Sequence, residues 1–336
     1  MMGKKILGLI VLFCCLWSLQ SSAQEGKVQM PMGKDGTFKI VQFTDIHYEP
    51  LKPESAESIE TMKKVLEAEQ PDLIIYTGDI VVGAPIADAI QAVFSIPEEM
   101  GIPFAFTFGN HDDEHDMDKE AIYSALQSFK QNITTRTEGI SGVTNYIIEL
   151  TASDQKELPQ ALLYVFDSHA YSGVEGLDGY DWIKSDQVQW YERESRAYTQ
   201  KNGGQPIPAL AYFHIPLPEY NYAAGSDKYR LYGSRMEAPC APLINTGLAA
   251  SMILNGDVMA TFVGHDHIND FLVSYHGLVL AYGRFTGGAT TYNDVVGGGG
   301  ARVVQLKAGE HSFRTWIRLS TGEVVKPYDT SAPYHK

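Results

Sequence analysis

Short apolar runs alternate with helical patterns along the first two thirds of the chain. Five runs are almost continuously apolar and are bounded by turn-forming residues, which is typical of buried strands. These runs are residues 38–44, 73–77, 104–108, 209–213 and 258–263. Other stretches repeat apolar residues at helical spacing, as Ile59, Met62, Val65 and Leu66 do, and the pattern predicts helices over residues 55–70, 85–94, 119–129, 186–200 and 243–254. This alternation predicts an α/β fold.

The last third of the chain changes to β patterns. Four further strands are expected there, over residues 271–275, 278–282, 302–306 and 313–318. His276-Gly277 separates the first two of them and is typical of a hairpin turn. Strand–helix units followed by a β-rich part indicate two sheets packed face to face, with helices outside. The polar segments described below run across most of the chain, so we expect one domain over residues 24–336.

The first 23 residues have the pattern of a signal peptide. Lys4 and Lys5 form a basic start, residues 6–17 are apolar, and Ser21-Ser22-Ala23 fits a cleavage site. The apolar stretch is short for a membrane span. We therefore expect an exported protein, periplasmic or extracellular, without a stable membrane anchor. Of the three cysteines, only Cys240 remains after cleavage, so an intramolecular disulfide is excluded and the core must stabilise the fold.

Five polar segments carry the chemical signal. Each one follows one of the five apolar runs at or near its end. They are Asp45-Ile46-His47, Gly78-Asp79, Gly109-Asn110-His111-Asp112, His214 and Gly264-His265-Asp266-His267. Sites in open α/β sheets lie beyond the carboxyl ends of the strands, so these segments are expected to meet at one place. Singly, each has a simpler explanation, such as a turn for Gly-Asp or a hydrogen-bonded core histidine for His214. Together they predict a metal site.

The ligand types define the chemistry of this site. Aspartate and asparagine oxygens combined with imidazoles, and no thiolate, suit two divalent or trivalent ions such as Fe, Zn or Mn. Two ions about 3.5–4 Å apart, held by a bridging carboxylate such as Asp79, can bind both the attacking and the leaving oxygen of a phosphoryl transfer. His111 adjoins Asn110 and could donate a proton to the leaving oxygen. The pattern predicts attack of a metal-bound hydroxide on a phosphoester.

In their order and spacing these segments resemble the calcineurin-like metallophosphoesterases. Gly109–Glu114, Gly179–Ile183, Asn245-Thr246-Gly247 and Gly264–Phe271 further resemble the branch related to fungal Dcr2 and plant purple acid phosphatase 29. The resemblance implies a four-layer α/β/β/α sandwich. It also implies a ligand set: a first metal held by Asp45, His47 and His267, a second held by Asn110, His214 and His265, Asp79 between the two, and His111 facing the substrate as the catalytic residue.

One position departs from the purple acid phosphatases. Those enzymes have a tyrosine ligand three residues after the aspartate of the Gly-Asp segment, where this chain has Val82. His47 stands in the first segment instead. We therefore expect no tyrosinate-to-iron charge transfer, which is the source of the purple colour.

Three further polar residues are candidates for supporting roles. Asp112 and Asp266 lie beside ligand residues, and we expect each to orient an imidazole through its second ring nitrogen. Arg284 follows an apolar run and precedes a glycine-rich segment. It could hold phosphate oxygens, although a structural ion pair is the favoured interpretation. Two aromatic segments, residues 168–184 and 216–235, are candidate loops that either form walls of the substrate pocket or pack onto the body of the protein.

Charge limits the partners. The net charge is −15, and loss of a leader with two lysines and no acid makes it −17. Such a surface repels nucleic acid and anionic membranes but leaves a small phosphoester compatible with a cationic metal centre. We therefore predict a metal-dependent phosphoric ester hydrolase acting on a phosphomonoester. The alternatives are a phosphodiesterase or nucleotidase on the same metal core, or a metal-loaded binding protein without turnover.

Overall fold

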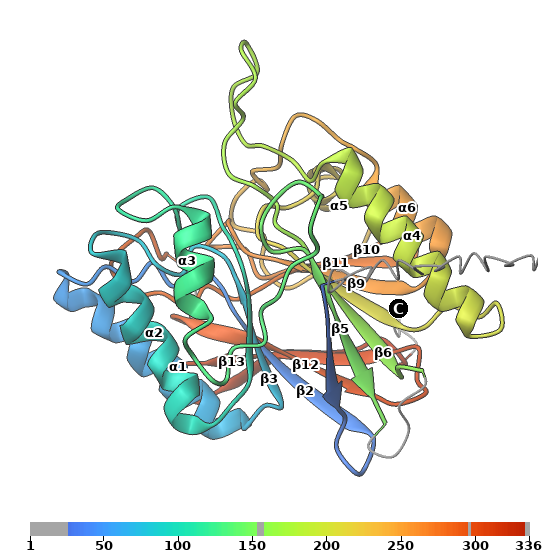
Figure 1. Ribbon diagram of the computed structural model, residues 1–336, viewed down its shortest axis with the longest axis horizontal. Coiled ribbons are helices and arrows are strands. Elements are labelled where there is room, and N and C mark those ends of the chain that lie inside the picture. Colours follow the sequence, from blue (N-terminus) through green and yellow to red (C-terminus); the bar gives the residue numbers. More distant parts are fainter. Residues whose placement is uncertain (1–25, 153–157, 295–296, 333–336) are drawn as a thin grey trace, which may run out of the picture.

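Two mixed β-sheets lie face to face, and helices cover their outer sides (Figure 1). The computed structural model describes residues 26–152, 158–294 and 297–332, so the predicted signal peptide lies outside the described residues. The six-stranded sheet has the order β14-β13-β12-β2-β3-β4, and the eight-stranded sheet has the order β1-β5-β6-β7-β9-β11-β10-β8. This is the four-layer α/β/β/α sandwich that the sequence predicts.

The strands have the following bounds. In the six-stranded sheet they are β2 (Thr37–Phe43), β3 (Leu73–Thr77), β4 (Phe104–Thr107), β12 (Gly300–Lys307), β13 (Phe313–Leu319) and β14 (Val324–Asp329). In the eight-stranded sheet they are β1 (Lys27–Pro31), β5 (Tyr146–Thr151), β6 (Ala161–Val165), β7 (Ala209–Tyr212), β8 (Leu231–Tyr232), β9 (Val258–Val263), β10 (Leu272–Tyr275) and β11 (Leu278–Tyr282). β10 and β11 form the hairpin expected at His276.

Three helices pack on each sheet. The outer face of the six-stranded sheet is covered by α1 (Ala56–Glu69), α2 (Ile86–Met100) and α3 (Lys119–Leu126). The eight-stranded sheet is covered by α4 (Ser185–Lys201), α5 (Pro218–Ala224) and α6 (Leu248–Asn255). A short 3-10 helix, Pro53–Ser55, precedes α1. Among the described residues, no helix has both the length and the apolar character needed to span a membrane.

The continuous apolar runs are explained by burial on both sides of each central strand. In β3, Ile74 and Tyr76 pack against the helices, whereas Leu73 and Ile75 point into the core between the two sheets. All four side chains are fully buried. Because successive side chains of a strand point to opposite faces, a strand covered on both faces needs apolar residues at every position. Each such side chain contributes about 1.5–3 kcal/mol on burial.

Some elements differ from the prediction. Residues 216–235 are not one long loop, since α5 and β8 lie within them. The helix expected from residue 243 begins at Leu248, because Gly247 has a φ of 87°, which is outside the helical region. Helix α2 continues past residue 94 to Met100 because Ile96 and Pro97 are buried against the sheet.

The topology brings the five polar segments together. β2, β3 and β4 are parallel neighbours in one sheet, and β7 and β9 are parallel neighbours in the other. Their carboxyl ends therefore face one edge of the sandwich. The backbone N–H of Gly264 donates to the carbonyl of His214, and that of Asp45 donates to the carbonyl of Gly78, which ties the loops within each sheet together.

Candidate metal centre

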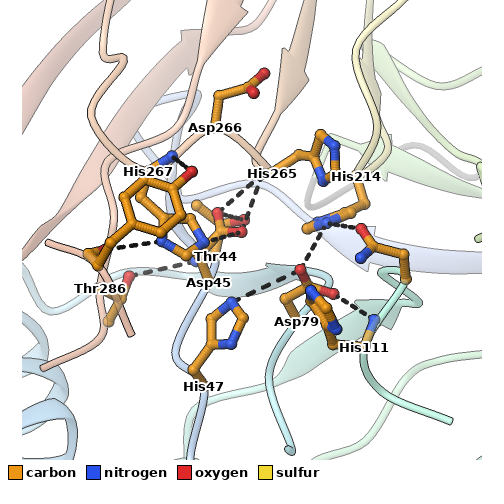
Figure 2. Close-up of polar contacts among 12 residues, drawn as sticks. Thr44, Asp45, His47, Asp79, His111, His214, His265, Asp266, His267 and Thr286 are labelled. Atoms are coloured by element: carbon orange, nitrogen blue, oxygen red, sulfur yellow. Dashed lines mark hydrogen bonds and ion pairs between the residues drawn. The ribbon is translucent and has the colours of Figure 1, made fainter. Parts of the chain in front are cut away.

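Two groups of buried ligand atoms lie where the strands end (Figure 2). The first contains Asp45, His47 and His267, and within each group the ligand atoms lie no more than 4.8 Å apart. His267 Nδ1 donates to the backbone carbonyl of Tyr292 at 2.9 Å. This bond leaves Nε2 as the free ring nitrogen, 3.6 Å from Asp45 Oδ1. The three residues are those that the family resemblance implies for the first metal.

The second group contains Asp79, His214 and His265. His214 Nδ1 donates to the carbonyl of Thr77 at 2.7 Å, which again directs Nε2 into the centre. The amide oxygen of Asn110 lies 3.2 Å from His214 Nε2, so Asn110 also reaches this group. The structure thus brings together all seven residues that were predicted as ligands.

Asp79 lies between the two groups. Its Oδ2 is 3.1 Å from His214 Nε2 in the second group and 3.7 Å from His47 Nε2 in the first. Its Oδ1 accepts the backbone N–H of His111 at 2.8 Å, which holds the carboxylate in this orientation. A ligand that bridges two ions needs this placement.

The donor set fits cations. His47 Nε2 is buried and has no hydrogen-bond partner, although nearly all buried polar groups in proteins have one. Burial lowers the pKa of His47 to about 3 and that of His267 to about 4, and it lowers the pKa of His265 well below its ordinary value. These imidazoles are therefore neutral, which is the form that binds metal.

His214 and Asp79 form a buried pair in which the proton lies on the imidazole. Burial opposes a charge on His214, but the carboxylates of Asp79 and Asp45 outweigh it and raise the pKa of His214 to about 9. Burial also disfavours ionised Asp79, yet His214 and the other imidazoles lower the pKa of this carboxyl well below its usual range. A cation held by these two side chains would take the place of the proton, so metal binding near neutral pH would release protons.

The ligand loops have an unusual backbone. Asp45, His47, Asp79 and His265 have φ values of 54°, 47°, 55° and 79°. Positive φ is uncommon in residues other than glycine and costs of order 1–3 kcal/mol at each position. Four of the seven candidate ligands share this strain. Its concentration at one place indicates that the fold holds these side chains for a function.

Glycines precede three of the ligands because the loops approach each other closely. A Cβ on Gly78 would lie 2.5 Å from the backbone nitrogen of Gly109, and a Cβ on Gly109 would lie 2.2 Å from Asp79 Oδ1. A Cβ on Gly264 would lie 1.9 Å from the hydroxyl oxygen of Thr44. The Gly-Asp, Gly-Asn and Gly-His pairs of the sequence thus mark the tightest contacts of the centre.

His111 lies beside the two groups and belongs to neither. Its side chain is 34% exposed, and its Nδ1 lies 2.6 Å from Glu114 Oε2. Its ring centroid is 5.4 Å from that of His47. Burial lowers the pKa of His111, but the charge of Asp79 and the hydrogen bond to Glu114 outweigh this effect and raise it above the ordinary value. The sequence analysis did not assign Glu114 as the partner of His111.

Asp112 and Asp266 support the centre through partners other than the imidazoles that we expected them to orient. Asp112 accepts the backbone N–H groups of Asp79, Ile80, Val81 and Gly109 at 2.7–3.1 Å and thereby joins two ligand loops. Asp266 accepts the hydroxyl of Tyr282 at 2.6 Å and the backbone N–H of Cys240. Neither carboxylate contacts an imidazole in these bonds. Both hold the backbone around the centre, because unpaired buried N–H groups must find an acceptor.

Arg284 forms the structural ion pair that is the favoured interpretation of the sequence. It is 1% exposed. Its guanidinium donates to Asp270 Oδ2 at 2.6 Å and to the carbonyl of Gly298 at 2.6 and 3.1 Å. This buried, paired guanidinium holds the segments of Asp270 and Gly298 together.

The first of the two aromatic segments contacts the metal centre, whereas the second contributes a tyrosine to the core. In residues 168–184, the Tyr180 ring lies edge-on to His265 with centroids 4.3 Å apart, and Tyr171 contacts Asn110. In residues 216–235, Tyr220 is buried and bonds to Thr261. The sequence did not indicate Tyr292, whose ring stacks on His267 at 4.1 Å.

Val82, which stands in place of a ligand tyrosine, gives a prediction about colour. The buried Tyr76 packs on Phe94, and the Tyr292 hydroxyl is within hydrogen-bond distance of Glu237 and of the backbone nitrogen of His267. We expect an iron-loaded sample to be colourless or faintly yellow. Absorption spectroscopy of the iron-loaded protein checks this, and an intense visible band from tyrosinate charge transfer would contradict it.

Comparison with known proteins agrees with this geometry. The family model described as calcineurin-like phosphoesterase matches residues 38–269. The chain therefore belongs to the calcineurin-like phosphoesterase family. The protein called probable inactive purple acid phosphatase 29 of Arabidopsis thaliana is 33% identical over 300 residues, which cover 80% of this chain and 76% of that protein. Phosphatase DCR2 of Saccharomyces cerevisiae is 32% identical over 322 residues, which cover 85% of this chain and 54% of DCR2.

Solved structures share the fold at low identity. A dimetal phosphatase from Danio rerio superposes with a TM-score of 0.58 at 12% identity, covering 87% of this chain and 98% of that one. The purple acid phosphatase PPD1 from yellow lupin (Lupinus luteus) gives a TM-score of 0.50 at 12% identity, covering 89% of this chain and 54% of that one. These similarities support the two-sheet architecture.

Proposed function

We propose that this protein is a phosphomonoesterase with a binuclear metal centre. One observation carries the proposal: a single carboxylate oxygen, Asp79 Oδ2, lies within 3.7 Å of imidazole nitrogens from both ligand groups. Asp45, His47 and His267 would hold one ion, and Asn110, His214 and His265 would hold the other. When bound, two such ions stabilise the charge of the phosphoryl group and lower the pKa of a water molecule.

The side chains outside the ligand set complete the reaction. His111 is exposed enough to reach a substrate, and the raised pKa that Asp79 and Glu114 give it favours the protonated form. It therefore donates a proton to the leaving oxygen. The backbone N–H of His111 holds Asp79 Oδ1, so the same loop positions a proton donor and the carboxylate between the ligand groups.

The names of the relatives suggest an alternative function, that of a metal-binding protein without catalytic turnover. Purple acid phosphatase 29 is called probable inactive, whereas the yeast relative is called a phosphatase. In this chain the ligand set is complete, and its imidazoles share one buried centre. A decayed site would be expected to lose such residues, because buried ligands and strained loops cost stability.

Turnover separates the proposal from its rivals. We expect protein reconstituted with Mn, Zn or Fe to hydrolyse p-nitrophenyl phosphate faster than bis(p-nitrophenyl) phosphate, and a chelator to abolish both activities until metal is restored. A faster rate on the diester would favour the phosphodiesterase. The same panel should include a nucleoside monophosphate, since a rate on it far above that on the chromogenic monoester would favour the nucleotidase.

We also propose that the protein is exported, on the basis of the leader pattern at residues 1–23. The mature chain would then begin at about Gln24 as one domain and act in the periplasm or outside the cell. The expected partners are small phosphoesters, not nucleic acids or a membrane. N-terminal sequencing of the secreted protein tests this, and an intact Met1 would contradict it.

A further inference from the structure

A hairpin reaches from the protein body to the second ligand group. Its two arms pair where the N–H of Ser172 donates to Gly179 and the N–H of Asp181 donates to Ala170. In Figure 1 the chain from β6 to α4, in yellow-green, includes a finger that projects beyond the sandwich. Tyr171 and Tyr180 form a cross-strand pair with stacked rings, 5.7 Å apart at an angle of 25°. The Tyr180 ring meets His265 edge-on at 4.3 Å.

Asn110 is the candidate ligand whose side chain ends in an amide, with an oxygen on one side and a nitrogen on the other. Its amide oxygen has lone pairs for a cation, whereas its amide nitrogen carries hydrogens and has none to offer. The two orientations have nearly the same shape, so the surroundings must select between them. The oxygen lies 3.2 Å from His214 Nε2, and the nitrogen donates to the hydroxyl oxygen of Tyr171 at 3.1 Å.

We propose that Tyr171 is a positioning residue for the second metal, because its hydroxyl accepts the amide N–H of Asn110 and so holds the amide oxygen toward His214. This inference rests on the metal centre of the proposed function. Tyr171 belongs to neither ligand group, and its ring centroid lies 6.4 Å from that of His111. It acts through Asn110, as outer hydrogen-bond partners orient ligands in other metal sites. Tyr171 is 48% exposed, so its hydroxyl oxygen serves this contact without being needed for the packing of the core.

Tyr171→Phe tests the inference by metal binding alone. The variant keeps the ring that stacks on Tyr180 and removes the hydroxyl, which accepts from Asn110 and also interacts with Glu114. We expect calorimetric titration with Mn²⁺ to show about a tenfold loss of affinity for the ion held by the second ligand group, at the lower end of the 10–100-fold cost of removing such partners. Affinity for the first ion should be unchanged. Tyr222→Phe, at an exposed tyrosine on α5, is the matched control and should lose nothing.

The same substitution in an Asn110→Asp variant tests whether Tyr171 acts by orienting the side chain of residue 110 or by stabilising the hairpin. In Asn110→Asp both side-chain oxygens can face the metal, so no partner is needed to choose between them. Tyr171→Phe should then cost less than about twofold in Mn²⁺ affinity. A tenfold loss that persists in this background would overturn the inference, because the hydroxyl would then act through the hairpin and not through the amide.

The outcomes also distinguish this inference from the proposed function. Wild-type protein that binds two ions, together with Tyr171→Phe that binds them equally well, would overturn the inference and leave the binuclear centre intact. Wild-type protein that binds one ion or none would overturn both. Since every readout is metal affinity, absence of turnover on a chosen substrate does not affect the test.

Discussion

Asp79→Asn is expected to lose affinity for both metal ions. Asparagine has the same shape but carries no negative charge, so it attracts two cations far less than aspartate does from the position between the ligand groups. Loss of an outer partner alone costs about 10–100-fold in metal affinity, so we expect at least about a 100-fold loss at each site. Metal analysis per chain after dialysis measures this.

Two comparison variants make the result specific. His47→Ala should lower the affinity of the first site only, because His47 belongs to one group. Asp88→Asn makes the same chemical change on the exposed face of α2 and should keep both ions. Retention of two ions by Asp79→Asn would show that this carboxylate does not bridge them.

His111→Ala is expected to keep both ions and to lose activity according to the leaving group. A general acid contributes about 10²–10⁴-fold, but only where the leaving oxygen needs a proton. A nitrophenolate leaves without protonation, whereas an alkoxide does not. We therefore expect a modest loss of kcat/KM on p-nitrophenyl phosphate and a loss of about 10²-fold or more on an alkyl phosphate.

His115→Ala is the control for this experiment, since His115 is an exposed histidine four residues further along the same loop. It should leave the rates on both substrates unchanged. Equal losses on the two substrates in His111→Ala would mean that His111 stabilises charge without transferring a proton. A fall in its metal content would mean that His111 is a ligand.

The sequence predicts the ligands well because each one follows an element with a strong local signal. Strands β3 and β9 are buried on both faces, so their apolar runs are continuous and end where the polar segments begin. The glycines before Asp79, Asn110 and His265 are visible in the sequence because close loop approach leaves no room for a Cβ. The apolar runs, the glycines and the ligand residue types therefore all mark the same positions in the sequence.

The supporting residues could not be predicted in this way. Asp112 and Asp266 accept mainly backbone N–H groups and a tyrosine hydroxyl, and such partners depend on the path of distant loops. Glu114 contacts His111 from three residues further along the same loop, and Tyr292 stacks on His267 from a distant segment, so the sequence alone does not single out either contact. Strands β1 and β5 were missed because β1 is half-exposed and short and β5 mixes polar with apolar positions, which weakens the pattern.

The most direct test of the binuclear phosphatase is a titration of activity against metal. Metal-free protein receives increasing equivalents of Mn²⁺ while the initial rate on p-nitrophenyl phosphate and the number of bound ions are measured on the same samples. The account predicts that the rate rises with occupancy of the second ion and reaches a plateau at two ions per chain. Two tightly bound ions without hydrolysis, or a full rate at one ion per chain, would contradict it.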